Sequence, residues 1–347
     1  MRLHEHEAAD IFEANGIPVP MRGLAESPGE AVRVAERIGC PVVVKAQVLA
    51  GGRGLAGGVK VASSLDQVSA AADAMLQSNL KGTTIRKLLV AEKVVGSREL
   101  YLGIAIDGYA GVPVVVASTE GGVRIEEVAR TAPDRIATMH VHPEQDLHPF
   151  LARKLLRRLG LSQRLLVTAA DAATRLYGLF RRFEALTVEV NPFIVRPDDS
   201  VVAVDAVFEI DNSALPRLQR HGLPDPLDRI DNPLERKGRE IGVSYVDLDG
   251  DIGMISSGAG LGLATMDIIG ERLRPANFLE TGGGITNDLL FNCMDLLTMK
   301  PGLRGILITM YGGINPIHEG AKGVARFVRE RSVDIPIVAK ALGNRQE

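Results

Sequence analysis

The chain of 347 residues contains no tryptophan, and aromatic residues make up only 4% of it. Single-stranded nucleic acids are bound largely by stacking bases on aromatic side chains, so the composition argues against such a platform. The two cysteines, Cys40 and Cys293, lie far apart and in no metal-ligand spacing, which predicts reduced structural thiols. No apolar run approaches the ~18 residues that a membrane span needs.

The chain also lacks a strong net charge. A value of −3 gives no case for nucleic acid or a membrane surface as a partner. No charged-then-apolar signal segment opens the chain, so we expect a cytoplasmic enzyme, or one of the mitochondrial matrix after processing. The length predicts two or three domains.

Glycine is abundant in one segment, residues 45–58, which follows the apolar β-branched run 41–44. The run predicts a buried strand, and the glycines let the backbone approach a ligand closely. Lys45 leaves the strand as a compact cation, and Arg53 adds a planar fork of donors. Backbone N–H groups, an ammonium and a guanidinium together suit phosphate oxygens. Because the spacing is not that of a P-loop, an exposed glycine loop with incidental basic residues remains the alternative.

A predicted hairpin brings acidic and amide side chains together. Residues 185–195 and 201–210 are strand-like and are joined by a polar turn. Antiparallel pairing across this turn places Asn191 opposite Asp205, and period-2 alternation places Glu189 on the same face as Asn191. Hard oxygen ligands of this kind suit Mg²⁺. The alternative is a polar, solvent-facing sheet surface.

The rest of the first half mixes helices with strands, which predicts an α+β portion. Three consecutive strands with short connections indicate one antiparallel sheet; they are 85–93, 99–106 and 112–117. Residues 211–236 are rich in Pro, Asp, Asn and Arg and lack periodicity, as is typical of a boundary. We therefore expect one domain at 1–235 and a second at 236–347.

In the second half, strands and helices alternate. Strands are predicted at 253–256, 276–279, 305–310 and 335–340, and glycine-rich turns follow the first three. This pattern is typical of an α/β fold with a doubly wound parallel sheet, whose loops bind ligands at the carboxyl ends of the strands. The Gly-x-Gly-x-Gly at Gly258 is a weak dinucleotide fingerprint because the full spacing is missing.

Several short motifs stand in collinear order along almost the whole chain. They are LHEHEA at 3–8, KAQ at 45–47 with AGGRG at 50–54, ELYLG at 99–103, STEGG at 118–122, EVNP at 189–192, GAGL at 258–261 with ATMD at 264–267, and GGG at 282–284. Together they resemble the β subunit of succinate–CoA ligase. The resemblance implies an ATP-grasp domain followed by a smaller flavodoxin-like ligase domain. It implies ADP- or GDP-forming acyl-CoA synthesis from a small dicarboxylate, with Mg²⁺ and ATP or GTP. It also implies an α subunit that binds CoA and carries the phosphorylated histidine.

The resemblance further implies a role for each matching position. Contacts to the nucleotide match Lys45, Gly52, Arg53, Gly54, Glu99 and, one residue from its expected place, Glu92. The Mg²⁺ ligands match Asn191 and Asp205, and Glu189 matches the carboxylate that meets the carrier histidine. Lys45, Arg53 and Glu189 would act by neutralising charge and orienting groups, which is most of what phosphoryl transfer requires. Positions that touch the organic acid match Ser257, Gly312, Gly313 and Ile314.

Two departures from the family pattern concern the acid. The family usually has Asn at the position of Ser257, and an Arg-containing run where this chain has 315–318, NPIH. The polar partners in the pocket therefore differ, which makes malate or another small carboxylate an alternative to succinate. The family also usually continues with another helix and strand beyond Glu347, which a truncated or a shortened chain would explain.

Two other functions remain open at this point. A stand-alone ATP-grasp enzyme that joins a carboxylate to an amine fits the first 210 residues, although the second domain argues against it. A nucleotide-binding subunit without turnover is favoured only by Ser257 and the short C-terminus.

Overall fold

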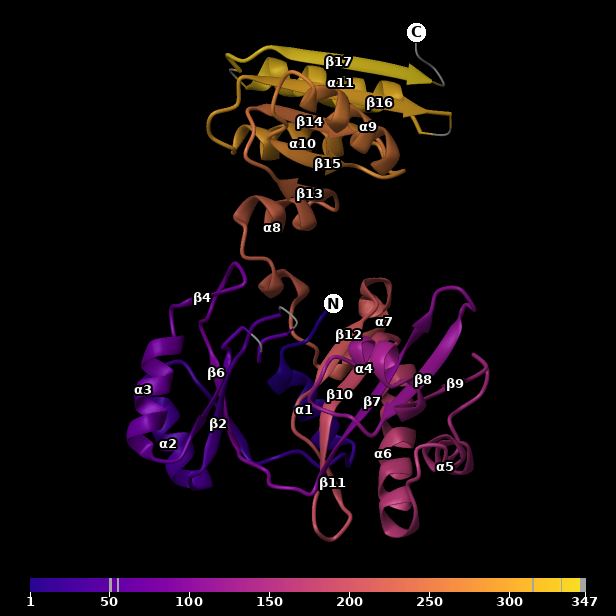
Figure 1. Cartoon of the computed structure of the whole chain (residues 1–347). Coiled ribbons are helices and arrows are strands. Elements are labelled where there is room, and N and C mark those ends of the chain that lie inside the picture. The colour runs from indigo at the N-terminus through magenta and orange to yellow at the C-terminus, as the bar shows by residue number, and fades with distance from the viewer. Residues whose placement is uncertain (50–51, 55, 314, 332, 344–347) are drawn as a thin grey trace. The chain divides into compact units, whose positions relative to one another are not determined.

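The computed structural model describes residues 1–49, 52–54, 56–313, 315–331 and 333–343. They form two compact units, Met1–Gly222 and Leu223–Glu347 (Figure 1). The expected boundary between residues 235 and 236 falls inside helix α8 (Pro233–Glu240), whose first turn is capped by the side chain of Asn232. Because a helix and its cap belong to one unit, the boundary lies before Asn232. The two compact units divide between residues 222 and 223.

An antiparallel sheet of order β1-β6-β2-β3 begins the N-terminal unit. Its strands are β1 (Arg22–Ala25), β2 (Val42–Ala46), β3 (Val59–Ala62) and β6 (Leu88–Glu92). Helices α2 (Pro28–Ile38) and α3 (Leu65–Met75) pack beside this sheet (Figure 1). Each begins after a serine, Ser27 or Ser64, whose side chain accepts a hydrogen bond from the backbone N–H three residues later. The short pair β4 (Asn79–Leu80) and β5 (Thr83–Thr84) follows α3.

The prediction that β6 joins the next two strands in one sheet is wrong. β6 pairs with β1 along one edge and with β2 along the other, so both of its edges are occupied. The chain then crosses to a second sheet, in which β7 (Arg98–Asp107) is central. In this crossing, Gly96 packs closely against β10 (Ala185–Val195), the strand beside β7. A Cβ on Gly96 would lie 2.3 Å from Ile194 Cγ2. A side chain at this position would obstruct the crossing.

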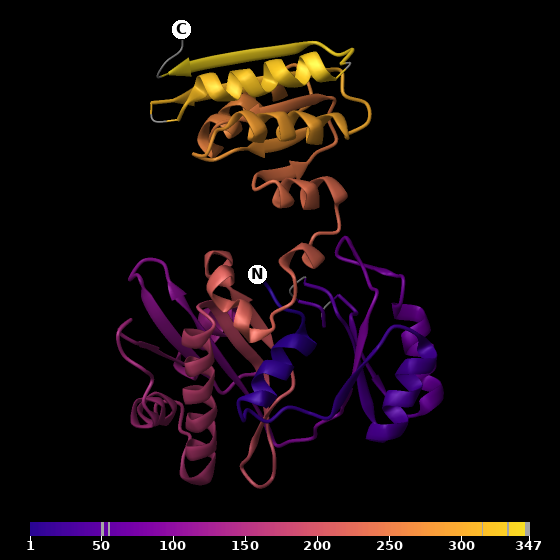
Figure 2. The ribbon, with the colours of Figure 1, turned by 180° about the vertical axis from the view of Figure 1, so that it is seen from behind.

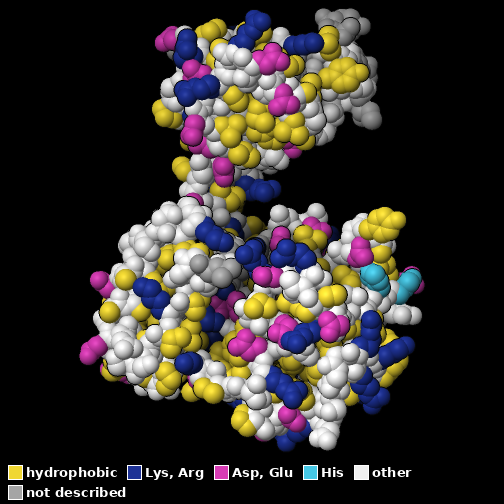
Figure 3. All heavy atoms as spheres, in the orientation of Figure 1, with side chains coloured by type: hydrophobic (Ala, Val, Ile, Leu, Met, Phe, Trp, Pro, Cys, Tyr) yellow, Lys and Arg dark blue, Asp and Glu magenta, His cyan; other side chains and the backbone are white. Residues whose placement is uncertain are grey.

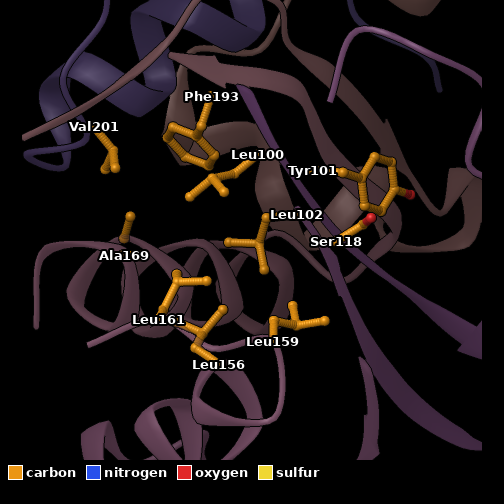
Figure 4. A pocket seen from close by; sticks show the side chains of 11 residues that line it. Leu100, Tyr101, Leu102, Ser118, Leu156, Leu159, Leu161, Ala169, Phe193 and Val201 are labelled. Carbon is orange, nitrogen blue, oxygen red and sulfur yellow. The ribbon is translucent and has the colours of Figure 1, made fainter. Parts of the chain in front are cut away.

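The second sheet is antiparallel, with order β11-β10-β7-β8-β9 and β12 also paired with β10. The remaining elements of this unit are α1 (Glu5–Ala14), β8 (Val112–Ser118), α4 (Ile125–Thr131), β9 (Ile136–His140), α5 (Pro149–Arg157), α6 (Gln163–Arg182), β10 (Ala185–Val195), β11 (Val201–Ala203), β12 (Val207–Ile210) and α7 (Leu215–Leu218). Gly160, at φ +76°, lies between α5 and α6, where the chain turns from one helix to the next. Figure 4 shows leucines of the α5–α6 region facing the sheet. The space between them measures only about 10 Å³, so this region is core.

The hairpin has the register that the sequence predicts. Val195 pairs with Val201, and Glu189 pairs with Val207. The same register sets Asn191 opposite Asp205, in the gap between β11 and β12 where the ladder is open. Both side chains therefore stand at a place where neighbouring strands leave room for a ligand.

The C-terminal unit is the predicted α/β sheet, with order β13-β15-β14-β16-β17. Its strands are β13 (Ser244–Asp247), β14 (Ile252–Ser256), β15 (Asn277–Glu280), β16 (Gly305–Gly312) and β17 (Ile337–Gly343). Neighbouring strands from β15 to β17 run parallel in a flavodoxin-like order, and β13 is an antiparallel edge strand that the sequence did not predict. Helix α9 (Ala259–Gly270) covers one face, and α10 (Asn287–Thr298) and α11 (Ile317–Glu330) cover the other (Figures 1 and 2).

The composition of the surface agrees with the near-neutral charge. On the face that Figure 3 shows, basic and acidic side chains are interspersed over the N-terminal unit. None of the helices in the described residues has the length and apolar character to cross a membrane.

Candidate functional site

A cavity of about 850 Å³ lies in the N-terminal unit. The first sheet contributes Val43, Val61 and Ala91 to its lining, and the second contributes Ile194 and Val207. Small-molecule sites commonly measure roughly 300–1,000 Å³, so the cavity can hold a ligand as large as a nucleotide.

Every residue that the sequence predicts for nucleotide or metal binding lines this cavity. They are Lys45, Gly52, Arg53, Gly54, Glu92, Glu99, Glu189, Asn191 and Asp205. They come from the glycine loop, from the crossing between the sheets and from the hairpin. The structure thus brings three distant segments to one place, while the role of each residue stays a prediction.

Lys45 and Arg53 are held from behind by one buried carboxylate. Glu5, the first residue of α1, has a side chain that is only 3% exposed. Its Oε1 lies 2.7 Å from Lys45 Nζ, and its Oε2 lies 2.9 Å from Arg53 Nη1. Lys45 Nζ also donates to the backbone carbonyl of Val204. These contacts fix two long basic side chains at the wall of the cavity.

Arg53 links the glycine loop to the hairpin. Its Nη2 lies 2.7 Å from Asp205 Oδ1, and its Nη1 donates to the carbonyl of Ala46 at 3.3 Å. With Glu5 and Lys45, the pair forms a cluster of two cations and two carboxylates, which is neutral as it stands.

The pKa values of Glu5 and Asp205 are shifted in opposite directions. Burial alone would raise the pKa of Glu5, but the charges of Lys45 and Arg53 outweigh burial and hold that pKa below its ordinary value. Burial, with the negative charge of Glu5, raises the pKa of Asp205. Glu5 is therefore the more firmly ionised counter-ion, and Asp205 is the one that a further cation would stabilise.

Asn191 is oriented by the loop that precedes α4. Its Nδ2 donates to the carbonyl of Val123 at 2.9 Å, and its Oδ1 accepts a hydrogen bond from the N–H of Gly122 at 2.8 Å. An amide oxygen has two lone pairs, so Oδ1 can still meet a cation. The loop therefore fixes the direction in which this oxygen points.

Glu189 completes the acidic side of the cavity. Burial, and then the negative charges of Asp205 and Glu126, raise the pKa of Glu189. Crowded carboxylates beside an amide oxygen are stabilised by a divalent cation, so Asn191 and Asp205 fit Mg²⁺. Within the described ranges, no three His, Cys, Asp or Glu side chains form a metal cluster.

Glu92 and Glu99 flank the crossing between the two sheets. Glu92 Oε1 lies 3.7 Å from Arg196 Nη2. Glu99 lies beneath the loop that orients Asn191, since a Cβ on Gly122 would stand 2.4 Å from Glu99 Oε2. Gly122 also has φ +72°, so both the space and the backbone favour glycine there.

In the C-terminal unit, the predicted acid-binding residues lie where parallel strands end. Ser257 follows β14, and Gly312 ends the neighbouring β16 and precedes Gly313. The Ser257 hydroxyl accepts from the N–H of Tyr311 at 2.9 Å and donates to its carbonyl at 3.0 Å. The hydroxyl proton is thus engaged by backbone and joins the two strand ends. Ile314 lies outside the described residues.

Sequence reasoning missed Glu5 as a site residue. An acid in the first turn of a helix is common because it is favoured by the helix dipole, so its local pattern indicates only a helix start. Its second role depends on residues 40 positions away or more, and no local signal reveals such contacts.

Comparisons with known proteins give a family match in each of the two units. A model of the ATP-grasp domain matches residues 2–195, and a model of the CoA-ligase family matches residues 255–347. The β subunit of an ADP-forming succinate–CoA ligase from Roseiflexus sp. (strain RS-1) is 41% identical over 353 residues, covering 100% of this chain and 92% of that protein. The chain belongs to the succinate–CoA ligase β-subunit family.

Other members of the family and a related fold extend the comparison. A GDP-forming succinate–CoA ligase β subunit from Thermus thermophilus is 39% identical over 353 residues, covering 100% of this chain and 92% of its own length. An ATP citrate lyase (D541A mutant) from Methanosaeta concilii, in complex with (3S)-citryl-CoA, matches 99% of this chain and 90% of its own with a TM-score of 0.75. At 17% identity this likeness is one of fold. The predicted ATP-grasp domain followed by a CoA-ligase domain is confirmed.

Proposed function

We propose that this chain is the nucleotide-binding β subunit of an ADP- or GDP-forming ligase that joins a small dicarboxylate, such as succinate, to CoA. One observation carries the proposal. The basic glycine loop and the carboxylate–amide hairpin line the same cavity and touch each other through Arg53 and Asp205.

The residues have distinct tasks in this proposal. Lys45, Arg53 and the backbone of Gly52 and Gly54 bind the nucleotide phosphates, while Glu92 and Glu99 bind elsewhere on the nucleotide. Asn191 and Asp205 hold Mg²⁺, which when bound neutralises phosphate charge. Glu189 accepts a hydrogen bond from the incoming imidazole and so orients it. Phosphoryl transfer depends mainly on such positioning and charge neutralisation.

An α subunit supplies the histidine and the CoA site. The terminal phosphoryl group of the nucleotide passes to a nitrogen of that histidine and releases the nucleoside diphosphate. The histidine then passes it to the carboxylate, giving an acyl phosphate, and the CoA thiol attacks the acyl carbon and expels phosphate.

Two features support a protein partner: the relatives are named as β subunits, and α9 exposes Leu261, Leu263 and Ile268. Hydrophobic side chains are gathered on the face of the C-terminal unit that Figure 3 shows.

The acid-binding part of the proposal assigns Ser257, Gly312, Gly313 and Ile314 to the substrate carboxylates. The hydroxyl proton of Ser257 is engaged by the carbonyl of Tyr311 and its N–H by the carbonyl of Thr309, so in this proposal Ser257 borders the substrate carboxylate without donating to it.

The proposal is tested by purifying the chain together with its α subunit and screening small carboxylic acids for ADP or GDP release. We expect release over many turnovers to require the acid, CoA and the α subunit together. Turnover by this chain alone, or with an amine in place of CoA, would contradict the proposal.

A further inference from the structure

We infer that Glu5 is a positioning residue for nucleotide binding, which holds Lys45 and Arg53 as a preformed pair of phosphate-binding cations. The inference rests on the proposed function, because it requires that the cavity takes nucleotide phosphates. Glu5 itself lies behind the two cations, so it acts through them.

The position of Glu5 is fixed from two sides. Just before α1, the N–H of Leu3 donates to the carbonyl of Phe208 in β12 at 2.9 Å. On the other side, the N–H of His6 donates to Gln47 Oε1, just after β2, at 3.1 Å. Glu5 lies between these attachments, so it is held relative to both the glycine loop and the hairpin.

The contacts leave donors for a ligand. Lysine has three N–H donors, and Glu5 and the carbonyl of Val204 use two of those on Lys45. Arginine has five, and among the described residues Glu5, Ala46 and Asp205 meet its two terminal nitrogens. Side chains that are already ordered lose less conformational entropy when a ligand binds. Glu5 thus fixes the two cations before the nucleotide arrives.

Charge and positioning predict opposite effects of the substitution Glu5→Gln. The change removes a negative charge near the phosphate site, so charge alone would make Mg·ATP bind more tightly. Loss of positioning instead weakens binding, because both cations lose a charged partner. We expect the dissociation constant for Mg·ATP to rise about tenfold or more, as on losing a charge-assisted hydrogen bond.

The experiment is isothermal titration of the full-length chain with Mg·ATP and, separately, with AMP. AMP lacks the terminal phosphates, so a defect in the Lys45–Arg53 pair affects its binding less. For Glu5→Gln we expect the dissociation constant for AMP to change by less than about twofold. The matched control is Glu13→Gln on the same helix, where an exposed carboxylate lies 2.9 Å from Arg22 Nη2. This control should leave both titrations unchanged. Unchanged or tighter Mg·ATP binding by Glu5→Gln, or equal weakening of ATP and AMP, would overturn the inference.

A second variant covers the case in which Glu5→Gln does not fold. Glu5→Asp keeps the charge, but its shorter side chain cannot reach Lys45 and Arg53 together. We expect it to fold and to weaken Mg·ATP binding without affecting AMP, and wild-type binding of Mg·ATP would overturn the inference. If the wild-type chain binds neither Mg·ATP nor Mg·GTP, the proposed function fails instead, so the two failures are distinguishable.

Discussion

Arg53 Nη2 lies 2.7 Å from Asp205 Oδ1, although the two residues are 152 positions apart in the chain. The guanidinium therefore contacts the carboxylate that we assign to Mg²⁺. When metal and nucleotide bind, we expect Arg53 to exchange Asp205 for phosphate oxygens. Glu5 contacts the other terminal nitrogen, Nη1, so this end of the fork can remain in place during the exchange.

Replacing Arg53 by Met should separate nucleotide binding from metal binding. The variant loses a bidentate phosphate donor, so we expect the dissociation constant for Mg·ATP to rise about tenfold or more. It also frees Asp205 from its cation, so Mn²⁺ without nucleotide should bind more tightly than to the wild type. Electron paramagnetic resonance of free Mn²⁺ measures the second effect. Arg217→Met, which breaks an exposed pair with Glu184, is the control, and weaker Mn²⁺ binding by Arg53→Met would contradict the exchange.

Much of the site could be predicted because its signals are local. The glycine-rich loop after a buried strand is visible in the residues themselves. The hairpin register follows from its polar turn and its alternation, which is why Asn191 and Asp205 are found opposite each other. Local chemistry of this kind decides both which side chains are present and which face they share.

The remaining features depend on contacts between distant segments. The run 88–92 predicts a strand, but only tertiary pairing decides that β1 and β2 occupy both of its edges. Glu5 has the pattern of an ordinary helix start, and its ion pairs depend on the packing of α1 against two other segments. For Ser257, the sequence cannot reveal that the carbonyl of Tyr311 takes its proton.

Glu189→Gln should raise stability while it removes activity. Folding raises the pKa of Glu189, so its ionised form opposes folding at neutral pH, and a neutral amide of the same shape removes that opposition. We expect a gain of about 0.5–2 kcal/mol, seen as a higher midpoint of thermal unfolding. Phosphorylation of the partner's histidine should fall at least about 100-fold. Unchanged phosphorylation would show that Glu189 has no role in the transfer. A lower midpoint of thermal unfolding would show that the ionised Glu189 does not oppose folding.

Ser257→Ala should affect stability more than the recognition of the acid. The variant loses both hydrogen bonds between the Ser257 hydroxyl and the backbone of Tyr311, which costs about 1–2 kcal/mol in urea unfolding. Because the hydroxyl proton is engaged by backbone, we expect the KM for the acid to change by less than about tenfold. A larger rise in KM with unchanged stability would instead indicate that the hydroxyl donates to the acid.

The acid sensitivity of the C-terminal unit should depend on Asp247. Lys300 Nζ lies 2.5 Å from Asp247 Oδ1, and Asn232 Nδ2 donates to Oδ2 at 3.1 Å. Partial burial would raise the pKa of Asp247, but the hydrogen bonds from Lys300 and Asn232 outweigh it and lower that pKa. A carboxyl group whose pKa is lowered by folding adds stability above its unfolded pKa, ~3.9, and loses it as the pH falls through the folded value.

Asp247→Asn should therefore reduce stability at pH 7 by about 1–3 kcal/mol. Its unfolding midpoint should also change less than that of the wild type as the pH falls below about 4. Calorimetry across this pH range measures both effects. Equal acid sensitivity of the two proteins would show that Asp247 is not the titrating group.

Two helical glycines should respond in opposite directions to the same substitution. A Cβ on Gly323 in α11 would lie 2.2 Å from the carbonyl oxygen of Asn287 and 3.1 Å from Leu290 Cβ, so Gly323→Ala forces α10 and α11 apart. We expect a loss of about 1–3 kcal/mol. Gly178 in α6 is exposed, and none of the described residues would lie within 4 Å of a Cβ there, so Gly178→Ala should stabilise the helix by about 0.5–1 kcal/mol.

Urea unfolding of the full chain measures both variants. Each substitution adds one methyl group to a helical glycine, so helix propensity favours alanine equally in the two cases. Stability changes of opposite sign would therefore reflect the lack of space at the contact between α10 and α11. An equal gain in stability from Gly323→Ala and Gly178→Ala would contradict this close contact. It would mean that α10 and α11 lie farther apart than the 2.2 Å distance from a Cβ on Gly323 to the carbonyl oxygen of Asn287 implies.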